Sequence, residues 1–201
     1  MTLRPDLAAI AEMIPRGSRV LDVGCGDGAL LEHLASTKGV DGRGIELVQQ
    51  NVNACVARGL PVMQGDADAD LVEYPSAAFD VAILSQTIQA TRSPRDVLGH
   101  LLRIGRRTVI SLPNFGHWRV RLAILVQGRM PRTQALGYEW YDTPNIHLCT
   151  IADFVALAAQ TGATIERALA LDEKGRTASM RADAWGPNLL ADGAIFLLRG
   201  K

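Results

Sequence analysis

The pattern of hydrophobic and polar positions changes regularly along the first half of the chain and predicts strands that alternate with helices. Short apolar runs of strand length are followed by segments in which apolar residues recur every three or four positions. The predicted strands are Arg19–Val23, Arg43–Glu46, Pro61–Gln64, Phe79–Leu84 and Thr108–Leu112. The predicted helices begin at Pro5, after Asp27 as the cap, at Val48 and at Ser93. We therefore predict a Rossmann-like, doubly wound α/β fold with helices on both faces of a mostly parallel sheet.

This alternation stops between Pro113 and Cys149, in a segment that holds most of the aromatic residues of the chain. These are Phe115, Trp118, Tyr138, Trp140 and Tyr141. We interpret residues 114–149 as an aromatic-rich insertion over the pocket of a single domain that spans residues 1–201, because inserted loops in such folds carry function. Trp118–Val126, within the insertion, is predicted to be helical.

The region after the insertion predicts one helix and two more strands. Thr150 and Asp153 have the spacing of a capping box for a helix that ends near Gln160. The two strands are Thr164–Leu171 and Ala194–Arg199, with a polar loop between them.

Composition narrows the class of protein further. Hydrophobic residues make up 48% of the chain and charged residues 21%, as in ordinary globular proteins. The 21 basic and 21 acidic residues cancel, which disfavours nucleic acid and anionic membranes as partners. Met1–Arg4 does not resemble a signal peptide and no apolar run reaches membrane-spanning length, so we expect a cytoplasmic protein. Cys25, Cys55 and Cys149 do not have the spacing of a disulfide framework or a metal site, and we expect free thiols and no metal.

The segment Val20–Gly28 is a strand that runs into a glycine-rich turn. Its glycines, Gly24, Gly26 and Gly28, allow positive φ angles and a close approach of a ligand to the backbone. Gly24, Gly26 and Ala29 also fit the fingerprint of dinucleotide-binding loops. Asp22 and Asp27, however, would repel a pyrophosphate. S-adenosyl-L-methionine carries an ammonium and a sulfonium but no phosphate, so the acidic loop favours this cofactor or S-adenosyl-L-homocysteine.

Two further carboxylates follow the next two predicted strands. Glu46 lies about 20 residues past the glycines, where an acid can accept both ribose hydroxyls. Asp66 follows the third strand, where an acid beside a backbone amide can bind the adenine. Each acid alone could equally be a loop cap or a solvated charge, but acids at three consecutive strand ends favour a site. The predicted cofactor contacts are Asp22, Gly24, Cys25, Gly26, Glu46, Leu47, Asp66, Ala67 and Ser85.

These residues resemble the class I S-adenosylmethionine-dependent methyltransferases over about Ser18 to Pro113. A closer resemblance, nearly end to end, is to the MetW family of methionine biosynthesis proteins. It rests on Val20–Leu34, Phe79–Thr91, Ser111–Trp118 and Tyr138–His147. The resemblance implies a seven-stranded sheet with an antiparallel last strand, a role in methionine biosynthesis and cooperation with a homoserine O-acyltransferase.

Several residues of the predicted pocket bear on which reaction it could perform. Neither Ser85–Ile88 nor Leu112–Phe115 has the Asn/Asp-Pro-Pro-aromatic motif of many amino-methylating relatives, which disfavours nucleobase methylation. Gln86 stands where many small-molecule relatives carry a histidine, which weakens the case for a base there. The candidate catalytic groups are His117, His147 and Tyr141, and the candidate substrate pocket is Gln86, Asn114, His117, Tyr141 and His147.

Each of these side chains also has a structural interpretation: the histidines as buried hydrogen-bonding groups, the aromatics as anchors of the insertion. The insertion is flanked by Arg119, Arg121, Arg129 and Arg132, which are either a solvated face or part of a partner surface. Two functions therefore stay open. One is a methyltransferase that acts on a small metabolite. The other is a cofactor-binding protein that regulates the acyltransferase, and the family resemblance favours this second function.

Overall fold

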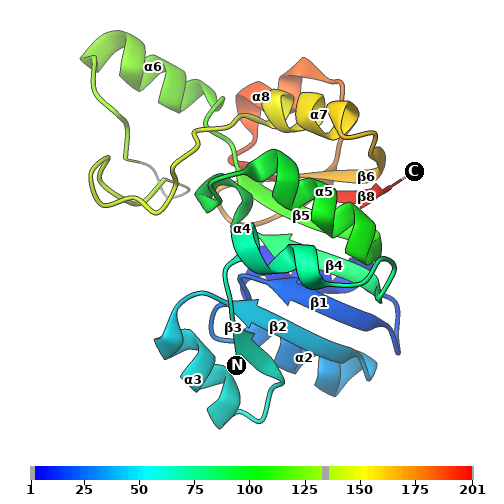
Figure 1. The fold of residues 1–201 in the computed structure, drawn as a ribbon. Helices are drawn as coiled ribbons and strands as arrows, with labels where there is room; N and C mark the ends of the chain where they lie inside the picture. The colour runs from blue at the N-terminus through cyan, green and yellow to red at the C-terminus, as the bar shows by residue number, and fades with distance from the viewer. Residues whose placement is uncertain (1–2, 133–135, 201) are drawn as a thin grey trace.

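The computed structural model describes residues 3–132 and 136–200. Within these residues, eight strands form one sheet in the order β3-β2-β1-β4-β5-β8-β6-β7 (Figure 1). The strands are β1 (Arg19–Val23), β2 (Asp41–Glu46), β3 (Val62–Gln64), β4 (Phe79–Ser85), β5 (Gly105–Pro113), β6 (Thr164–Leu171), β7 (Thr177–Ser179) and β8 (Gly193–Arg199). β1 to β5 pair in parallel, and β8 runs antiparallel to both β5 and β6. The predicted doubly wound sheet with an antiparallel last strand is confirmed.

The predicted strand number is wrong by one. The extra strand is β7, which pairs antiparallel with the end of β6 inside the segment predicted to be a polar loop. Its three residues, Thr-Ala-Ser, are all exposed, so no alternation of hydrophobic and polar positions marks it. Backbone pairing alone makes it a strand.

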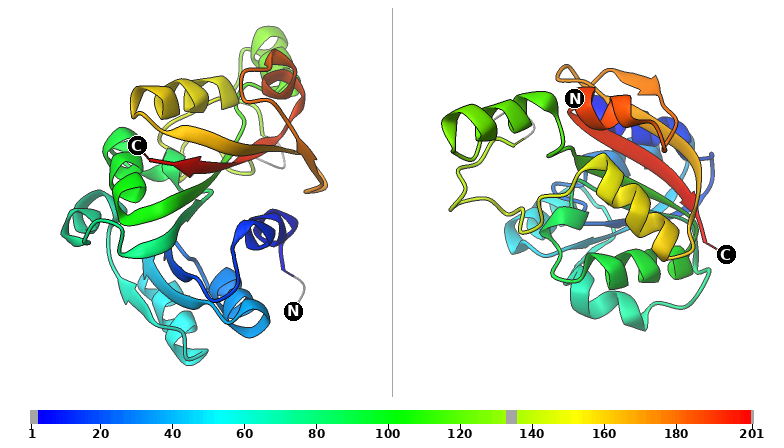
Figure 2. Two further views of the ribbon diagram at one scale, coloured as in Figure 1. Left: turned by 90° about the vertical axis from the view of Figure 1, so that its right-hand side faces the viewer. Right: turned by 90° about the horizontal axis from the view of Figure 1, so that it is seen from above.

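Helices cover both faces of the sheet (Figure 2). They are α1 (Pro5–Met13), α2 (Ala29–Lys38), α3 (Gln49–Ala57), α4 (Ala67–Asp70), α5 (Pro94–Ile104), α6 (Trp118–Gln127), α7 (Ile151–Gln160) and α8 (Trp185–Leu190), with short 3-10 turns η1 (Leu71–Glu73) and η2 (Ile88–Ala90). α1 and α2 pack on one face, whereas α5 and α7 pack on the other. The capping box of Thr150 and Asp153 is present at the start of α7, as predicted.

The strand β4 shows how the sequence produces two cores. Successive side chains of a strand point to opposite faces. Val81 and Ile83 accordingly join the core beneath α1 and α2, while Ala82 and Leu84 join the core beneath α5 and α7. A strand buried on both faces needs the continuous apolar run that the sequence has here.

Three short features differ from the predicted elements. Gly28, not Asp27, is the N-cap of α2, and Asp27 instead accepts a hydrogen bond from the Ala29 N–H at 3.2 Å. α4 and α8 were not predicted, because four and six residues are too few for a helical hydrophobic period to emerge.

The strand order reverses at β1, which pairs with β2 on one side and β4 on the other. In open α/β sheets, ligands bind in the crevice outside the carboxyl ends of the strands at such a point. α6 and the loop after it lie on that side of the molecule, away from the sheet (Figure 1). None of the helices in the described ranges has the length and hydrophobicity that crossing a lipid bilayer requires.

Candidate functional site

The glycine-rich turn follows β1 at the point where the strand order reverses. Gly24, Gly26 and Gly28 all have positive φ angles, of 70°, 57° and 79°, as the sequence predicts. The N–H groups of Gly24 and Cys25 donate to the Ile45 carbonyl at 2.8 and 3.2 Å. These bonds fix the turn to the end of β2.

The three glycines differ in what surrounds them. A Cβ on Gly24 would lie 2.7 Å from Thr87 Oγ1, and one on Gly28 would lie 2.5 Å from Leu60 Cδ1. A Cβ on Gly26 would have no heavy atom within 4 Å. Gly24 and Gly28 therefore permit close packing of the turn, whereas Gly26 borders open space where a ligand can approach.

Glu46 is buried at the carboxyl end of β2 and connects the turn to that strand. Its Oε2 accepts the Gly26 N–H at 2.8 Å and its Oε1 accepts the Val48 N–H at 2.9 Å. Each carboxylate oxygen can accept a second hydrogen bond. Glu46 can therefore hold the glycine turn in place and still accept two hydroxyl groups of a ribose.

Asp22 is the most unusual charged group of the site. Only 2% of it is exposed, and its Oδ1 has no hydrogen-bond partner among the described residues. Burial, followed by the nearby negative charge of Glu46, raises the pKa of Asp22 to about 7. A buried acceptor without a partner calls for an explanation. A cationic ligand group beside Asp22 would provide one.

Asp66 lies at the carboxyl end of β3 and is the N-cap of α4. Its Oδ1 accepts the Asp68 N–H at 2.9 Å, and its Oδ2 forms an ion pair with Arg92. Asp68 in turn accepts the N–H groups of Arg92 and Ser93, both at 2.8 Å. Ala67 is the first residue of α4, and the N–H of a first helical residue has no intrahelical partner. An adenine can thus meet an acceptor and a donor here, although Arg92 competes for the carboxylate.

The end of β4 is hydrogen-bonded to β5 at two serines. Ser85 Oγ lies 3.1 Å from Ser111 Oγ, and the Gln86 N–H donates to the Ser111 carbonyl at 3.0 Å. Gln86 has a φ of 53°, a left-handed conformation that is strained for a residue with a side chain. Such strain clusters at functional sites.

A cavity of about 560 Å³ opens beside Gln86. It is lined by the ends of β4 and β5, by residues 4–6, by residues 171–175 and 192–193, and by Tyr138, Pro144 and Asn145 from the segment that precedes α7. Sequence reasoning missed the contributions of residues 4–6 and 171–175, because nothing in their local pattern shows that the sheet topology brings them to this edge.

The other predicted pocket residues lie outside this lining. Asn114 is buried and donates to the carbonyls of Asn188 and Ala191 at 3.0 and 2.8 Å. His117 is buried at the start of α6 and its Nδ1 accepts the Arg119 N–H at 3.2 Å. His147 lines a smaller cavity of about 90 Å³ next to α7.

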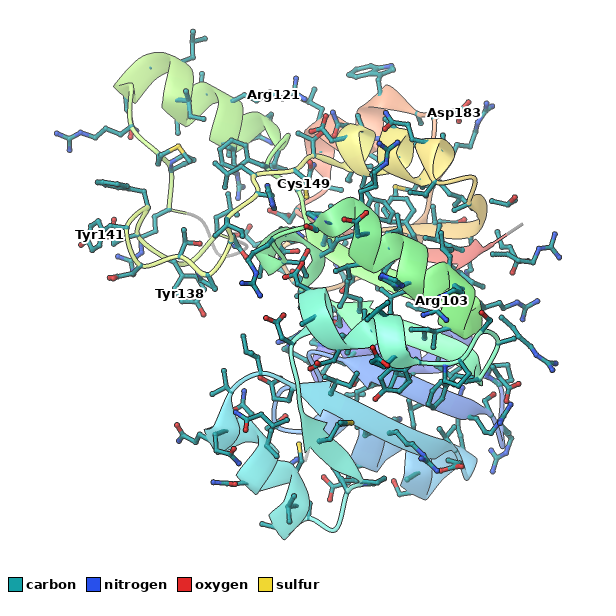
Figure 3. All side chains as sticks on the ribbon, in the orientation of Figure 1. Arg103, Arg121, Tyr138, Tyr141, Cys149 and Asp183 are labelled. Atoms are coloured by element: carbon teal, nitrogen blue, oxygen red, sulfur yellow. The ribbon has the colours of Figure 1, made fainter. Side chains whose placement is uncertain are left out.

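Tyr141 also lies apart from the cavity. It is exposed at the outer part of the loop, in an edge-to-face contact with Trp140, and Tyr138 lies closer to the sheet (Figure 3). Among the described residues, Gln86 is therefore the one member of the predicted pocket set that lines the 560 Å³ cavity.

The remaining predicted cofactor contacts differ in exposure. Leu47 is exposed just past β2, whereas the Cys25 side chain packs inward against Leu31 and Cys55. All three cysteines are free thiols, as predicted, and burial raises the pKa of each. The thiols are therefore protonated at neutral pH.

Comparison with solved structures defines the class of the fold. A S-adenosylmethionine-dependent methyltransferase from Mesorhizobium loti superimposes with a TM-score of 0.70 and 18% identity, over 97% of each chain. One from Thermotoga maritima also gives 0.70, at 14% identity, over 98% of this chain and 88% of the other. The chain has the fold of the S-adenosylmethionine-dependent methyltransferases.

The model of one family, the methionine biosynthesis protein MetW, matches residues 4–198. The chain belongs to the MetW family, whose methyltransferase-like fold is associated with methionine biosynthesis. The bifunctional methionine biosynthesis protein MetXA/MetW of Rhodopirellula baltica is 34% identical over 97% of this chain and 32% of its own length. A ubiquinone biosynthesis O-methyltransferase of Xylella fastidiosa is 35% identical over 49% of this chain and 43% of its own length. The chain thus spans about a third to under half of these relatives.

Proposed function

We propose that the chain binds S-adenosyl-L-methionine or S-adenosyl-L-homocysteine and regulates a homoserine O-acyltransferase to which it binds. The observation that carries the cofactor assignment is the buried, unpartnered Oδ1 of Asp22 beside the glycine turn. The ammonium of the cofactor provides the positively charged partner that Asp22 lacks. Glu46 accepts the ribose hydroxyls, and Asp66 with the Ala67 N–H binds the adenine.

The proposed partner contact is α6 with the loop that follows it, here called the arm (described residues 118–132 and 136–148). Of the ten residues of α6, only Val120 is buried. The exposed large apolar side chains of the arm are Trp118, Leu122, Ile124, Leu125, Val126, Met130, Tyr138, Trp140, Tyr141, Ile146 and Leu148. Exposed apolar surface of this extent marks interaction sites in proteins.

The predicted arginines support an interface only in part. Arg119 pairs with Glu173 and Arg132 pairs with Glu139, at 3.0 and 2.9 Å, and Arg121 Nε donates to the Gly116 carbonyl at 2.6 Å. These three hold the arm in shape. The exposed apolar side chains are the part of the arm left for a partner.

The choice of an acyltransferase rests on the bifunctional relative. In that protein a MetXA part and a MetW part are joined in one chain. Joining two proteins raises their effective concentration, which is useful when they act together. We infer that the separate chain makes through its arm the contact that the fused protein maintains covalently.

A second candidate function is methyl transfer to a small metabolite, and the 560 Å³ cavity beside Gln86 favours it. Methyl transfer mainly requires that a nucleophile be held against the sulfonium methyl. Since His117, His147 and Tyr141 do not line this cavity, a methyltransferase reaction here would act on an acceptor that needs none of them as a base.

The experiment that separates the two functions measures acyl transfer and S-adenosyl-L-homocysteine release together. The chain is assayed alone and with a homoserine O-acyltransferase from the same organism. The regulatory function predicts a stable complex and a changed acyltransferase rate without methyl turnover. Turnover of a metabolite with no complex would establish the methyltransferase function instead.

The cofactor assignment has its own test by calorimetry. Glu46→Ala removes both the ribose acceptors and the bonds that hold the glycine turn, so we expect cofactor affinity to fall by tenfold or more. Glu166→Ala, on β6, is the control, because this carboxylate pairs with Arg107 and Arg199 instead. Equal affinities of the two variants for S-adenosyl-L-homocysteine would refute the assignment.

A further inference from the structure

The segment that follows β4 contacts the glycine turn through Thr87. A Cβ on Gly24 would lie 2.7 Å from Thr87 Oγ1 and 2.9 Å from its Cγ2. Both distances are too short for a real contact, so the Thr87 side chain occupies the space that glycine leaves free. The Thr87 hydroxyl donates to the Ser85 carbonyl at 2.8 Å, which fixes the side chain in this position. Thr87 thus packs the end of β4 directly against the turn of the proposed cofactor site.

The same segment holds the arm through Gln89, two residues further along. Thr87 is the N-cap of η2 and Gln89 is its middle residue. The Gln89 backbone carbonyl accepts the N–H groups of Ile146 and His147 at 3.0 and 2.9 Å. These bonds fasten the arm where it returns to the domain ahead of α7. One short piece of backbone therefore contacts the glycine turn at one end and the arm at the other.

Hydrogen bonds and packing inside the segment make it move as a unit. Gln89 Nε2 donates to the Gln86 carbonyl at 2.7 Å, and the Ala90 N–H donates to the Thr87 carbonyl at 2.8 Å. Ile88 and Gln89 are only 3% and 4% exposed, so the surrounding core restrains both. Closely packed groups transmit a displacement instead of absorbing it. A movement of Thr87 is therefore passed on to the Gln89 carbonyl.

The backbone at the start of the segment is held in a strained conformation. Gln86 has a φ of 53°, and its N–H donates to the Ser111 carbonyl at 3.0 Å. Such strain persists only where the surrounding structure imposes it, and it is typical of switch regions. The strain at Gln86 therefore supports a role of this segment in transmitting a change.

We propose that Thr87 is a positioning residue that transmits occupation of the cofactor site to the arm. A cofactor bound against Gly26 restrains the glycine turn, and Thr87 passes this restraint to η2. The Gln89 carbonyl then holds the N–H groups of Ile146 and His147 more firmly. This inference rests on the proposed cofactor site and names the residue through which that site acts on the arm.

The test follows the exchange of the Ile146 and His147 amide hydrogens by NMR, in the full chain with and without saturating S-adenosyl-L-homocysteine. Exchange of a hydrogen-bonded amide requires local opening, so its rate reports how firmly the Gln89 carbonyl holds the arm. We expect the ligand to slow the exchange of both amides in the wild type by about fivefold or more, as in ordinary allosteric coupling. Calorimetry on each protein establishes the saturating concentration.

Two substitutions of Thr87 change its contact with the glycine turn by different amounts. Thr87→Ala removes both the contact with Gly24 and the bond to Ser85, so saturating ligand should no longer slow the exchange. Thr87→Ser keeps the hydroxyl and removes only the methyl group, so the slowing should fall to an intermediate value. This milder variant keeps the test decisive if Thr87→Ala fails to fold.

Thr91→Ala is the matched control. Thr91 is the C-cap of the same turn η2, and its hydroxyl likewise donates to a backbone carbonyl, that of Ile88, at 2.8 Å. The three atoms nearest to a Cβ on Gly24 all belong to Thr87, so Thr91→Ala leaves that contact in place. This variant should keep the full slowing by the ligand.

Three outcomes would overturn the proposal. The ligand binds the wild type without slowing the two amides, the Thr87 variants keep the full slowing, or Thr91→Ala loses it as completely as Thr87→Ala. None of these outcomes contradicts the proposed cofactor site, whereas an absence of binding in calorimetry would refute that site and the transmission with it. A chain that binds no acyltransferase can still show the transmission, because the amides of the arm are observed directly.

Discussion

At the residue scale, the buried carboxylate of Asp22 destabilises the folded protein but offers a partner for a cationic ligand group. The carboxylate is buried at the end of β1 without a partner for its Oδ1, and its pKa is raised from 3.8 to about 7. Burial of an ionised group without a partner is costly, so the folded protein favours the protonated acid. A cofactor ammonium would remove that cost by pairing with the ionised form.

The raised pKa predicts how stability changes with pH. Below about pH 4 the acid is protonated in both the folded and the unfolded chain and costs nothing. As the pH rises to about 7, only the unfolded chain releases the proton readily, and stability falls by up to about 4 kcal/mol. Asp22→Asn cannot ionise, so its stability relative to the wild type should rise from pH 5 to pH 8. Urea unfolding at both pH values measures this difference.

The control for this prediction is Asp41→Asn, which removes an exposed carboxylate from the start of β2. If Asp22→Asn and Asp41→Asn change the stability by the same amount at both pH values, the burial of Asp22 does not affect its titration.

The affinity for S-adenosyl-L-homocysteine should rise with pH, whereas the stability falls. S-adenosyl-L-homocysteine should release a proton when it binds near pH 7 and should bind more tightly at pH 8 than at pH 6, because its ammonium favours ionised Asp22.

The sequence predicts where the acids of the candidate site lie better than it predicts the position of Gln89, which connects the end of β4 to the arm. Asp22, Glu46 and Asp66 each follow a strand that the hydrophobic pattern reveals, so their placement at one edge of the sheet follows from the parallel topology. No comparable hydrophobic pattern in the sequence indicates where Gln89 lies. Its role depends on a hydrogen bond to Gln86 and on an arm that starts almost thirty residues later, and such long-range contacts leave no local pattern.

At the element scale, the glycine turn offers a clean test of ligand approach. Gly26 and Gly39 both have positive φ angles, of 57° and 63°, and a Cβ on either would meet no atom within 4 Å. Gly26→Ala and Gly39→Ala should each cost roughly 1 kcal/mol, because the left-handed conformation disfavours alanine. Only Gly26→Ala should also weaken S-adenosyl-L-homocysteine binding, by about tenfold or more.

Urea unfolding and calorimetry on both variants measure these two effects. Gly39 closes the far end of α2, so it serves as the control for backbone strain alone. A loss of cofactor affinity in both variants would mean that strain, rather than contact with the ligand, causes the loss.

The arm predicts a separate effect on partner binding. Leu122 and Leu125 project from α6 with 48% and 82% exposure, so their replacement by serine should change the stability by less than about 0.5 kcal/mol. The same double variant should weaken binding to the acyltransferase at least tenfold, since a few apolar side chains carry most of the binding energy of an interface. Surface plasmon resonance and urea unfolding provide the two measurements.

Val56 and Val72 are the matched control for the arm variant. They are exposed to 58% and 56% on α3 and η1, away from the arm. Their replacement by serine should leave the complex intact. Equal weakening by both double variants would show that general surface hydrophobicity, not the arm, holds the partner.

The elements themselves differ in how well the sequence predicts them. β4 and α7 carry a long apolar run and a capping box, and the predicted bounds nearly coincide with Phe79–Ser85 and Ile151–Gln160. β7 and α8 are short and depend on neighbours for their pairing and packing. Local pattern therefore fails where tertiary contacts determine the secondary structure.

At the scale of the whole molecule, one continuous path joins the proposed cofactor site to the arm. The Ser85 carbonyl at the end of β4 accepts a hydrogen bond from the hydroxyl of Thr87, which packs against Gly24 of the glycine turn. The adjacent, strained Gln86 accepts a hydrogen bond from Gln89. Gln89 in turn holds the backbone of Ile146 and His147. A ligand that shifts the end of β4 can therefore change the arm that a partner contacts.

This path predicts reciprocal coupling between cofactor and acyltransferase. If S-adenosyl-L-methionine changes the dissociation constant of the complex by some factor, the acyltransferase must change the dissociation constant of the cofactor by the same factor. We expect a factor of roughly 5–150, the range of ordinary allosteric coupling. Calorimetry of each ligand in the presence and absence of the other measures both factors. Glu46→Ala should bind the cofactor at least tenfold more weakly. At a cofactor concentration that occupies only the wild type, this variant must therefore show no effect of the cofactor on the complex. If the two wild-type factors are both one, the arm binds its partner independently of the cofactor, and the path through Gln89 carries no regulation.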